Sequence, residues 1–173
     1  MPLSIHVSVP KQRLTLKRGR KTERTYPVST SAYGLGSEPD SMKTPLGRFQ
    51  IAQKIGDAMP IETAFKSREP VPLTPEMLRE EDLIMSRILW LHGIEPHNSN
   101  TRDRYVYIHG TNHEETIGTP ASHGCIRMRN ADVAELFDLV EVGTSVLIVA
   151  NESSGRPRKS ARKALRTKGV LPK

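Results

Sequence analysis

Cysteine is almost absent from this sequence, since Cys125 is the only one among 173 residues. A lone cysteine excludes an internal disulfide, so nothing in the composition implies export into an oxidising compartment. Long apolar runs are also absent: no window of about 18 or more residues is apolar throughout, which excludes a membrane-spanning helix. A chain of this length suits one domain with a real core and is too short for two comfortable ones.

The first nine residues lack the parts of a secretory signal. No basic segment, apolar core and small-residue cleavage site follow Met1, and the chain goes directly into strand-like alternation. As given, the sequence predicts a cytoplasmic protein. An export signal removed from the chain would instead place it in the periplasm or the cell wall.

The net charge of +7 is concentrated at one end of the chain. Residues 151–173 carry eight basic residues against Glu152 alone, whereas residues 1–150 carry eighteen basic and eighteen acidic ones. This division predicts a neutral body, 1–150, and a basic, disordered tail, 151–173. A basic tail suits nucleic acid, anionic lipid or an acidic partner, but we favour a solvated end and expect no nucleic-acid partner. The sequence leaves the oligomeric state open.

Hydrophobic alternation predicts a chain dominated by strands. The segments rich in β-forming residues are 3–9, 13–16, 24–30, 48–52, 83–91, 105–109 and 145–149. One helix is expected over 131–140, with Asn130 as its cap and apolar residues at Val133, Leu136, Phe137 and Val140. The fold class is therefore mainly β with one clear helix.

A proline-rich stretch interrupts this pattern. Residues 54–75 contain four prolines and little periodicity, which predicts an irregular excursion over the surface or over a site. Thr74 is placed to cap a short helix that runs through Glu81, with Pro75 in its first turn.

The residues suited to covalent catalysis fall in two segments, 108–112 (IHGTN) and 122–128 (SHGCIRM). A cysteine attacks as the thiolate, and a nearby imidazole is the usual means of producing it at neutral pH. His123 lies two residues before Cys125, where an extended chain separates the side chains by about 7 Å, too far for a direct hydrogen bond. His109 comes from a different strand and is the better candidate for the base.

Backbone groups complete the candidate site. The carbonyl of Gly110 is a possible acceptor for the second nitrogen of the base. The N–H groups of Gly124 and Cys125 are natural donors to a developing oxyanion, and Arg127 is positioned to bind a substrate carboxylate. From these residues alone Cys125 is a candidate nucleophile, because a lone cysteine is often only a small buried hydrophobe.

Together with KTPLGRF at 43–49, the two segments closely resemble the L,D-transpeptidase catalytic domain, also called the YkuD domain. The resemblance covers roughly residues 3–150. It implies a β-sandwich or mixed-sheet fold in which Cys125 is acylated by a peptidoglycan stem tetrapeptide, at the bond between diaminopimelate and the terminal D-alanine. We expect this reaction to need no cofactor and no metal.

The resemblance also assigns roles residue by residue. His109 matches the general base, and Gly110 stands where a backbone carbonyl orients it. His123 and Gly124 belong to the catalytic motif, while Ser122 and Arg127 fall with the substrate-binding residues. Carbapenem-type β-lactams are the expected acylating inhibitors.

Two departures favour one branch of the family. The sequence shows no export signal, and the region 54–104 looks like an insertion into the 1–150 domain. Both resemble cytoplasmic L,D-carboxypeptidases that trim recycled muropeptides with water as the acceptor. The alternatives are a transpeptidase that forms 3-3 cross-links or exchanges D-amino acids, and a binding module without catalysis that holds wall fragments.

Two further interpretations concern individual residues. Arg87 stands in an apolar run, where it is either paired with an acid such as Asp82 or serves as a second clamp for the substrate carboxylate. A zinc site would require histidines such as His109, His113 and His123 beside Cys125, but their spacing matches no zinc pattern well, so we expect no metal.

Overall fold

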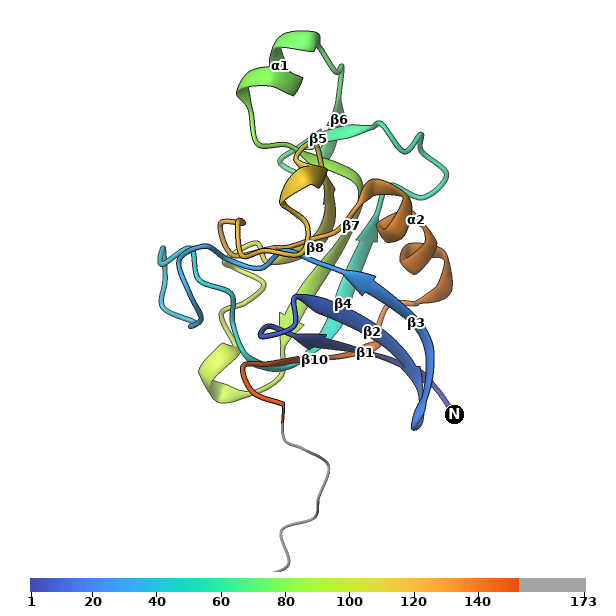
Figure 1. The fold of residues 1–173 in the computed structure, drawn as a ribbon, viewed down its shortest axis with the longest axis vertical. Helices are drawn as coiled ribbons and strands as arrows, with labels where there is room; N and C mark the ends of the chain where they lie inside the picture. The colour runs from blue at the N-terminus through green and yellow to red at the C-terminus, as the bar shows by residue number, and fades with distance from the viewer. Residues whose placement is uncertain (153–173) are drawn as a thin grey trace, which may run out of the picture.

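The computed structural model describes residues 1–152, so most of the predicted basic tail, from residue 153 onward, lies outside the described residues. Within that range one mixed sheet dominates (Figure 1). Its strands are β1 Leu3–Ser8, β2 Arg13–Arg18, β3 Lys21–Pro27, β4 Gly47–Ile55, β5 Ala64–Lys66, β6 Glu69–Val71, β7 Ile84–Gly93, β8 Tyr107–Thr111, β9 Ile126–Arg127 and β10 Ser145–Val149. The helices are α1 Pro75–Glu80 and α2 Asn130–Leu139, with 3-10 turns η1 Pro96–Asn98 and η2 Glu114–Thr116. The prediction of a mainly β fold with one clear helix is confirmed.

The strand order is β3-β2-β1-β10-β4-β7-β5-β6, with β8 paired to β7 and β9 to β8. Neighbours are antiparallel except for β1 with β10 and β8 with β9, which run parallel. Strand β7 is the centre of this arrangement, because it pairs with β4, β5 and β8. Its long apolar sequence follows from that position, since a strand with neighbours on both edges is buried along most of its length.

Helix α2 covers the sheet with the face that its apolar spacing predicts. Val133, Leu136 and Phe137 are buried in the same core as Leu89 and Leu91 of β7. The helix lies beside β7 and β8 (Figure 1), so the strand that carries His109 is fixed against the main core.

The start of α2 differs from the prediction that Asn130 caps it. The residue at the cap position is Arg129, which makes no side-chain cap hydrogen bond. Asn130 instead bridges the helix to β8: its Oδ1 accepts from the Thr111 N–H at 2.9 Å and its Nδ2 donates to the Thr111 carbonyl at 2.9 Å. Thr111 lies at the end of β8, and its N–H and carbonyl would otherwise be buried without partners. The Asn130 amide satisfies both groups.

The proline-rich region is more regular than its sequence predicts. Its first part forms the short hairpin β5–β6 and α1, which project from one end of the sheet in Figure 1. Thr74 caps α1 as predicted, since its Oγ1 accepts from the Met77 N–H at 3.2 Å. The hairpin was not predicted because its strands of three residues are too short to show a period.

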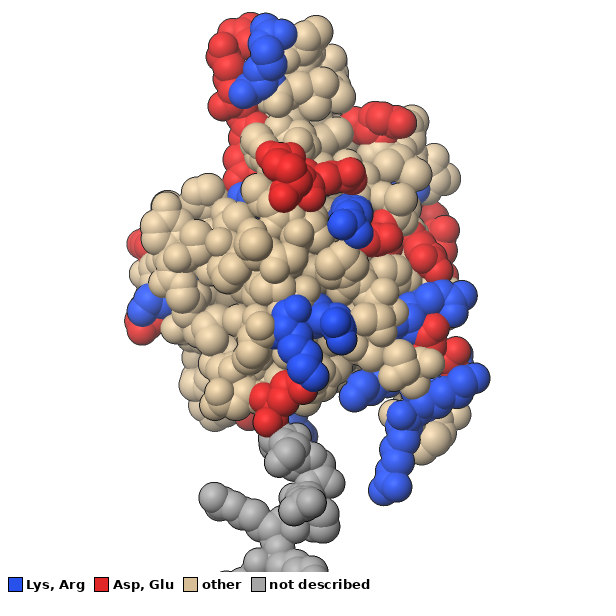
Figure 2. Space-filling view, in the orientation of Figure 1, with Lys and Arg blue, Asp and Glu red and all other residues tan. Residues whose placement is uncertain are grey.

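Two surface properties complete the description of residues 1–152. No helix in this range is long and apolar enough to cross a membrane. Figure 2 shows basic side chains at the lower right of that face, around the β2–β3 hairpin, while acidic side chains gather higher, toward α1.

We predict that Asn130→Ala lowers the free energy of unfolding by about 2 kcal/mol, because it leaves the buried backbone groups of Thr111 without partners. Urea denaturation monitored by circular dichroism measures this change. Asp138→Ala, on the exposed face of the same helix, is the matched control and should change stability by less than about 0.5 kcal/mol. Equal effects of the two substitutions would contradict the bridging role.

Candidate active site

The site is built where β8 and β9 run parallel. Their register pairs Ile108 with Ile126 and His109 with Arg127, which brings Cys125 beside Tyr107. The Tyr107 N–H donates to Cys125 Sγ at 3.3 Å, and the thiol donates to the Tyr105 carbonyl at 3.4 Å. The nucleophile is therefore tethered to the strand that carries the candidate base.

His109 is buried, with only 4% of its surface exposed. Its Nδ1 lies within hydrogen-bond distance of the Gly110 carbonyl, and a carbonyl only accepts, so Nδ1 carries the proton and Nε2 presents a lone pair. Burial lowers the pKa of His109 to about 4, against the opposing effect of the Gly110 carbonyl. The imidazole is consequently neutral at physiological pH and ready to accept a proton.

Close packing explains why residue 110 is a glycine. A Cβ built at this position would collide with Asn130 Oδ1 and with the Met85 carbonyl. The close approach of β8 to β7 and to α2 therefore leaves no room for a side chain at the residue that orients His109.

The thiol is neutral as well. Burial raises the pKa of Cys125 to about 11, although the Tyr107 N–H and the nearby Arg127 charge oppose this rise. The resting pair is therefore thiol and imidazole rather than a preformed thiolate and imidazolium. Such a pair needs the proton to move as the bond to the substrate forms, as in serine hydrolases.

The loop before the thiol is held from two sides. Ser122 Oγ donates to the Cys125 carbonyl and accepts from the Gly124 N–H at 3.3 Å. From the other side, Thr44 Oγ1 donates to the Gly124 carbonyl at 3.0 Å and accepts from the Ser31 N–H at 3.0 Å. Thr44 belongs to the TPLG segment, so this motif supports the catalytic loop.

These contacts revise the expected oxyanion donors. The Gly124 N–H is already directed to Ser122, whereas the Cys125 N–H has no hydrogen-bond partner among residues 1–152. Gly124 adopts φ = +122°, a conformation open mainly to glycine, and this turn of the chain directs the peptide before Cys125. Of the two donors, only the Cys125 N–H is available.

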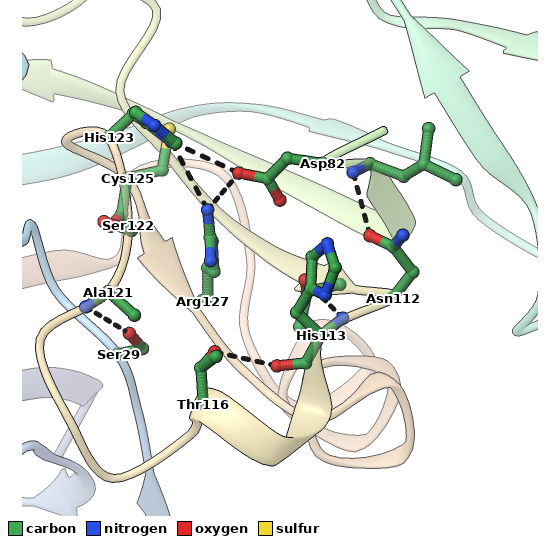
Figure 3. Close-up of polar contacts among 12 residues, drawn as sticks. Ser29, Asp82, Asn112, His113, Thr116, Ala121, Ser122, His123, Cys125 and Arg127 are labelled. Atoms are coloured by element: carbon green, nitrogen blue, oxygen red, sulfur yellow. Dashed lines mark hydrogen bonds and ion pairs between the residues drawn. The ribbon is translucent and has the colours of Figure 1, made fainter. Parts of the chain in front are cut away.

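Arg127 lies in a cluster with an acid and a histidine (Figure 3). Its Nη2 forms an ion pair with Asp82 Oδ2, which also lies 3.2 Å from His123 Nδ1. The Arg127 side chain is 5% exposed. Its charge is thus balanced by the protein's own carboxylate, which leaves it poorly placed to take a substrate carboxylate as well.

The structure does not bring Arg87 to the site. A bulge between Met85 and Ile88, with Ser86 at φ = +69°, sets the alternation of β7 so that Ile88 packs on the Cys125 side. Arg87 faces α2, where its guanidinium lies 5.5 Å from the Phe137 ring and Nη1 donates to the Ser86 carbonyl at 2.7 Å. It pairs neither with substrate-facing groups nor with Asp82.

The remaining histidines take no part in this cluster. His113 Nδ1 lies 3.1 Å from Glu115 Oε1, on η2. Among residues 1–152, no three His, Cys, Asp or Glu side chains are grouped as metal ligands. That the reaction needs no metal stays a prediction.

Sequence reasoning missed Asp82 as part of the site. The sequence suggested Asp82 only as a partner for Arg87, because residues 82 and 127 are brought together only by the fold. An arginine two residues after the nucleophile was the one available signal, because a buried arginine requires an anionic partner.

We predict that Thr44→Val destabilises the protein by about 1–3 kcal/mol and slows alkylation of Cys125, since it keeps the shape but removes the hydroxyl that joins Ser31 to Gly124. Thermal unfolding and labelling with iodoacetamide measure the two effects. Thr119→Val removes an exposed hydroxyl nearby and should change neither; a matching loss there would contradict the role of Thr44.

Comparisons with known proteins identify the family of this chain. The family model for the L,D-transpeptidase catalytic domain, YkuD, matches residues 2–148. The chain is 30% identical over 148 residues to "Putative L,D-transpeptidase YkuD" of Bacillus subtilis, covering 86% of this chain and 66% of the relative. It is 44% identical over 72 residues to "Putative L,D-transpeptidase YqjB" of the same organism, covering 42% of this chain and 41% of the relative.

Solved structures show the same fold. An L,D-transpeptidase from Mycobacterium smegmatis superposes with a TM-score of 0.56 at 20% identity, covering 86% of this chain and 59% of that one. LdtMt1 in complex with imipenem gives a TM-score of 0.53 at 23% identity, covering 85% and 58%. The chain thus spans less than two thirds of the length of these proteins. With the family model matched over nearly all described residues, the chain belongs to the L,D-transpeptidase catalytic domain (YkuD) family.

Proposed function

We propose that this protein is a cysteine-dependent L,D-carboxypeptidase that removes the terminal D-alanine from peptidoglycan stem tetrapeptides. The observation that carries the proposal is a thiol tethered to β8, the strand that also carries a buried imidazole whose Nε2 makes no hydrogen bond within residues 1–152. Family membership supplies the substrate class, because the relatives are named L,D-transpeptidases.

In the first half-reaction Cys125 Sγ attacks the L-centre carbonyl of diaminopimelate while His109 Nε2 takes the thiol proton. The carbonyl oxygen becomes an oxyanion and receives a hydrogen bond from the Cys125 N–H. Collapse of this intermediate breaks the C–N bond, and the imidazolium returns its proton to the departing amine. The products are a thioester on Cys125 and free D-alanine.

In the second half-reaction water replaces the amine. His109 removes a proton from water as it attacks the thioester, and collapse releases the tripeptide carboxylic acid and restores the thiol. Hydrolysis is supported by the segment between β4 and β7, from which Asp82 reaches Arg127 and Arg68 reaches Tyr107, so that it flanks the thiol. We expect this segment to restrict the space for a second stem peptide as acceptor.

Transpeptidation is the alternative outcome for the same acyl-enzyme, with 3-3 cross-links or D-amino-acid exchange as its products. Carbapenems are the proposed acylating inhibitors in either case, since LdtMt1 is known in complex with imipenem. Opening of the lactam by Cys125 would leave a thioester without a departing amine.

We predict that His109→Ala lowers the rate of acylation at least about 100-fold, because a thiol with a pKa near 11 needs a base to react at neutral pH. His113→Ala, which alters a partly exposed histidine bonded to Glu115, is the control and should react like the wild type. Mass spectrometry after mixing with imipenem measures both. Equal rates would remove His109 from the mechanism.

The pH profile follows from the two pKa shifts. Because the pKa of His109 is lowered to about 4, the wild-type kcat/KM should fall only as the pH approaches that value and the base becomes protonated. Because the pKa of Cys125 is raised to about 11, alkylation by iodoacetamide in His109→Ala should keep rising with pH above 8. A plateau of reactivity near pH 6 would indicate a preformed thiolate instead.

Products decide the second half-reaction. Incubation with disaccharide tetrapeptide, followed by liquid chromatography and mass spectrometry, should yield tripeptide and free D-alanine. Cys125→Ala should retain the fold and lose turnover. Dimers joined through two diaminopimelate residues, or D-amino-acid exchange that outpaces hydrolysis, would identify a transpeptidase. If neither the tetrapeptide nor imipenem acylates Cys125, the protein is a binding module without catalysis.

A further inference from the structure

Three aromatic side chains form a wall beside the thiol: Trp90 of β7, Tyr107 of β8, and Tyr105, which lies just before β8. The Trp90 and Tyr105 rings stack with centroids 5.8 Å apart, and the Tyr107 ring meets Trp90 edge-on at 5.6 Å. Tyr107 is buried with Cys125 packed against its cluster, whereas Tyr105 is 53% exposed. The wall thus runs from the nucleophile to the surface.

Arg68, at the tip of the β5–β6 hairpin, lies across this wall. Its guanidinium is 4.9 Å from the Trp90 centroid and 5.0 Å from that of Tyr105, and its Nη1 donates to the Tyr107 hydroxyl at 3.2 Å. Stacking and this hydrogen bond fix the plane of the guanidinium. Within residues 1–152, Arg68 pairs with no carboxylate, so its remaining N–H donors are unused.

The turn that carries Arg68 is strained. Ser67 and Arg68 are the two residues of the hairpin loop and have φ = +47° and +66°, values that favour Asn or Gly in turns of this kind. Residues held in such conformations cost of order 1 kcal/mol or more each and tend to occur at functional sites. An arginine at this position therefore indicates a use for the side chain.

Two other arginines whose charges act on the thiol, Arg127 and Arg104, are already engaged. Arg127 is paired with Asp82. Arg104, whose pKa is lowered by burial, donates to the carbonyls of Gly36 and Lys43 and to the Ser41 hydroxyl. Arg68 is separated from Cys125 by one tyrosine side chain, since the Tyr107 N–H binds Sγ and the Tyr107 hydroxyl binds Arg68.

We propose that Arg68 binds the free C-terminal carboxylate of the departing D-residue, which rests on the carboxypeptidase function proposed above. That carboxylate lies one residue, about 3.5 Å of extended chain, beyond the carbonyl that Cys125 attacks. A planar guanidinium held on aromatic faces suits a carboxylate through paired hydrogen bonds. Arg68 takes the part that Arg127 and Arg87 were expected to play.

The test compares two substrates: the tetrapeptide with a free terminal carboxylate and the same peptide as its C-terminal carboxamide. The wild type should prefer the acid in kcat/KM by about 10- to 100-fold, the value of one charge-assisted hydrogen-bonded contact. Arg68→Ala should lose this preference through a higher KM for the acid. Arg68→Lys should restore part of it.

Arg102→Ala is the matched control, because this guanidinium lies 5.0 Å from the same Trp90 ring but makes no hydrogen bond to Tyr107. It should retain the preference for the acid. Equal cleavage of acid and amide by the wild type, or an unchanged preference in Arg68→Ala, overturns the role of Arg68 while the proposed function stands. Failure of both peptides to yield free D-alanine or its amide overturns the proposed function itself.

Discussion

The short parallel pairing of β8 with β9 is the constraint on which the site depends. Strand β9 has only two residues, so its own ladder cannot hold it. Two further contacts secure it: the Met128 N–H donates to the His109 carbonyl at 2.8 Å, and Ser29 and Arg127 exchange backbone hydrogen bonds at 2.9 Å. The candidate base lies on β8 and the candidate nucleophile directly precedes β9. The β8–β9 pairing therefore sets the distance between them. The chain just beyond β3 thus helps to locate the thiol.

Burial explains why the proposed nucleophile and base rest as neutral groups. The same packing that fixes the imidazole and the thiol removes water from them, which disfavours imidazolium and thiolate alike. Nearby, the Asp82 carboxylate balances Arg127 and limits the field of a buried guanidinium on the thiol. A resting thiol resists adventitious oxidation and alkylation better than a thiolate. In the proposed mechanism, the thiol therefore reacts only once a substrate carbonyl lies beside the thiol and the base.

The parts of the molecule that could be predicted from sequence are those set by local pattern. The spacing of Val133, Leu136 and Phe137 indicated α2 and its buried face, and the two motif segments indicated the family, which the family model confirmed. Asn130 shows where local pattern fails. Its residue type predicts a helix cap, but its side-chain amide instead binds the backbone of Thr111 at the end of β8. Arg87 was misplaced because a bulge resets the alternation of β7, and no sequence period shows a bulge. Asp82 joins the site only through the long-range fold.

The site draws its residues from two parts of the chain. Strands β8 and β9 are fixed in the main core through Ile108 and Ile126, whereas the hairpin β5–β6 and α1 form one continuous detour at the edge of the sheet, between the end of β4 at Ile55 and the start of β7 at Ile84. Such a detour can change in length and sequence while the strands on either side keep their register. The tip of the hairpin is then a natural place to engineer selectivity. If Arg68 reads the peptide end as proposed, varying residues 66–70 would alter which ends are accepted, while the buried Phe65, which packs with Tyr107 and Cys125, is kept.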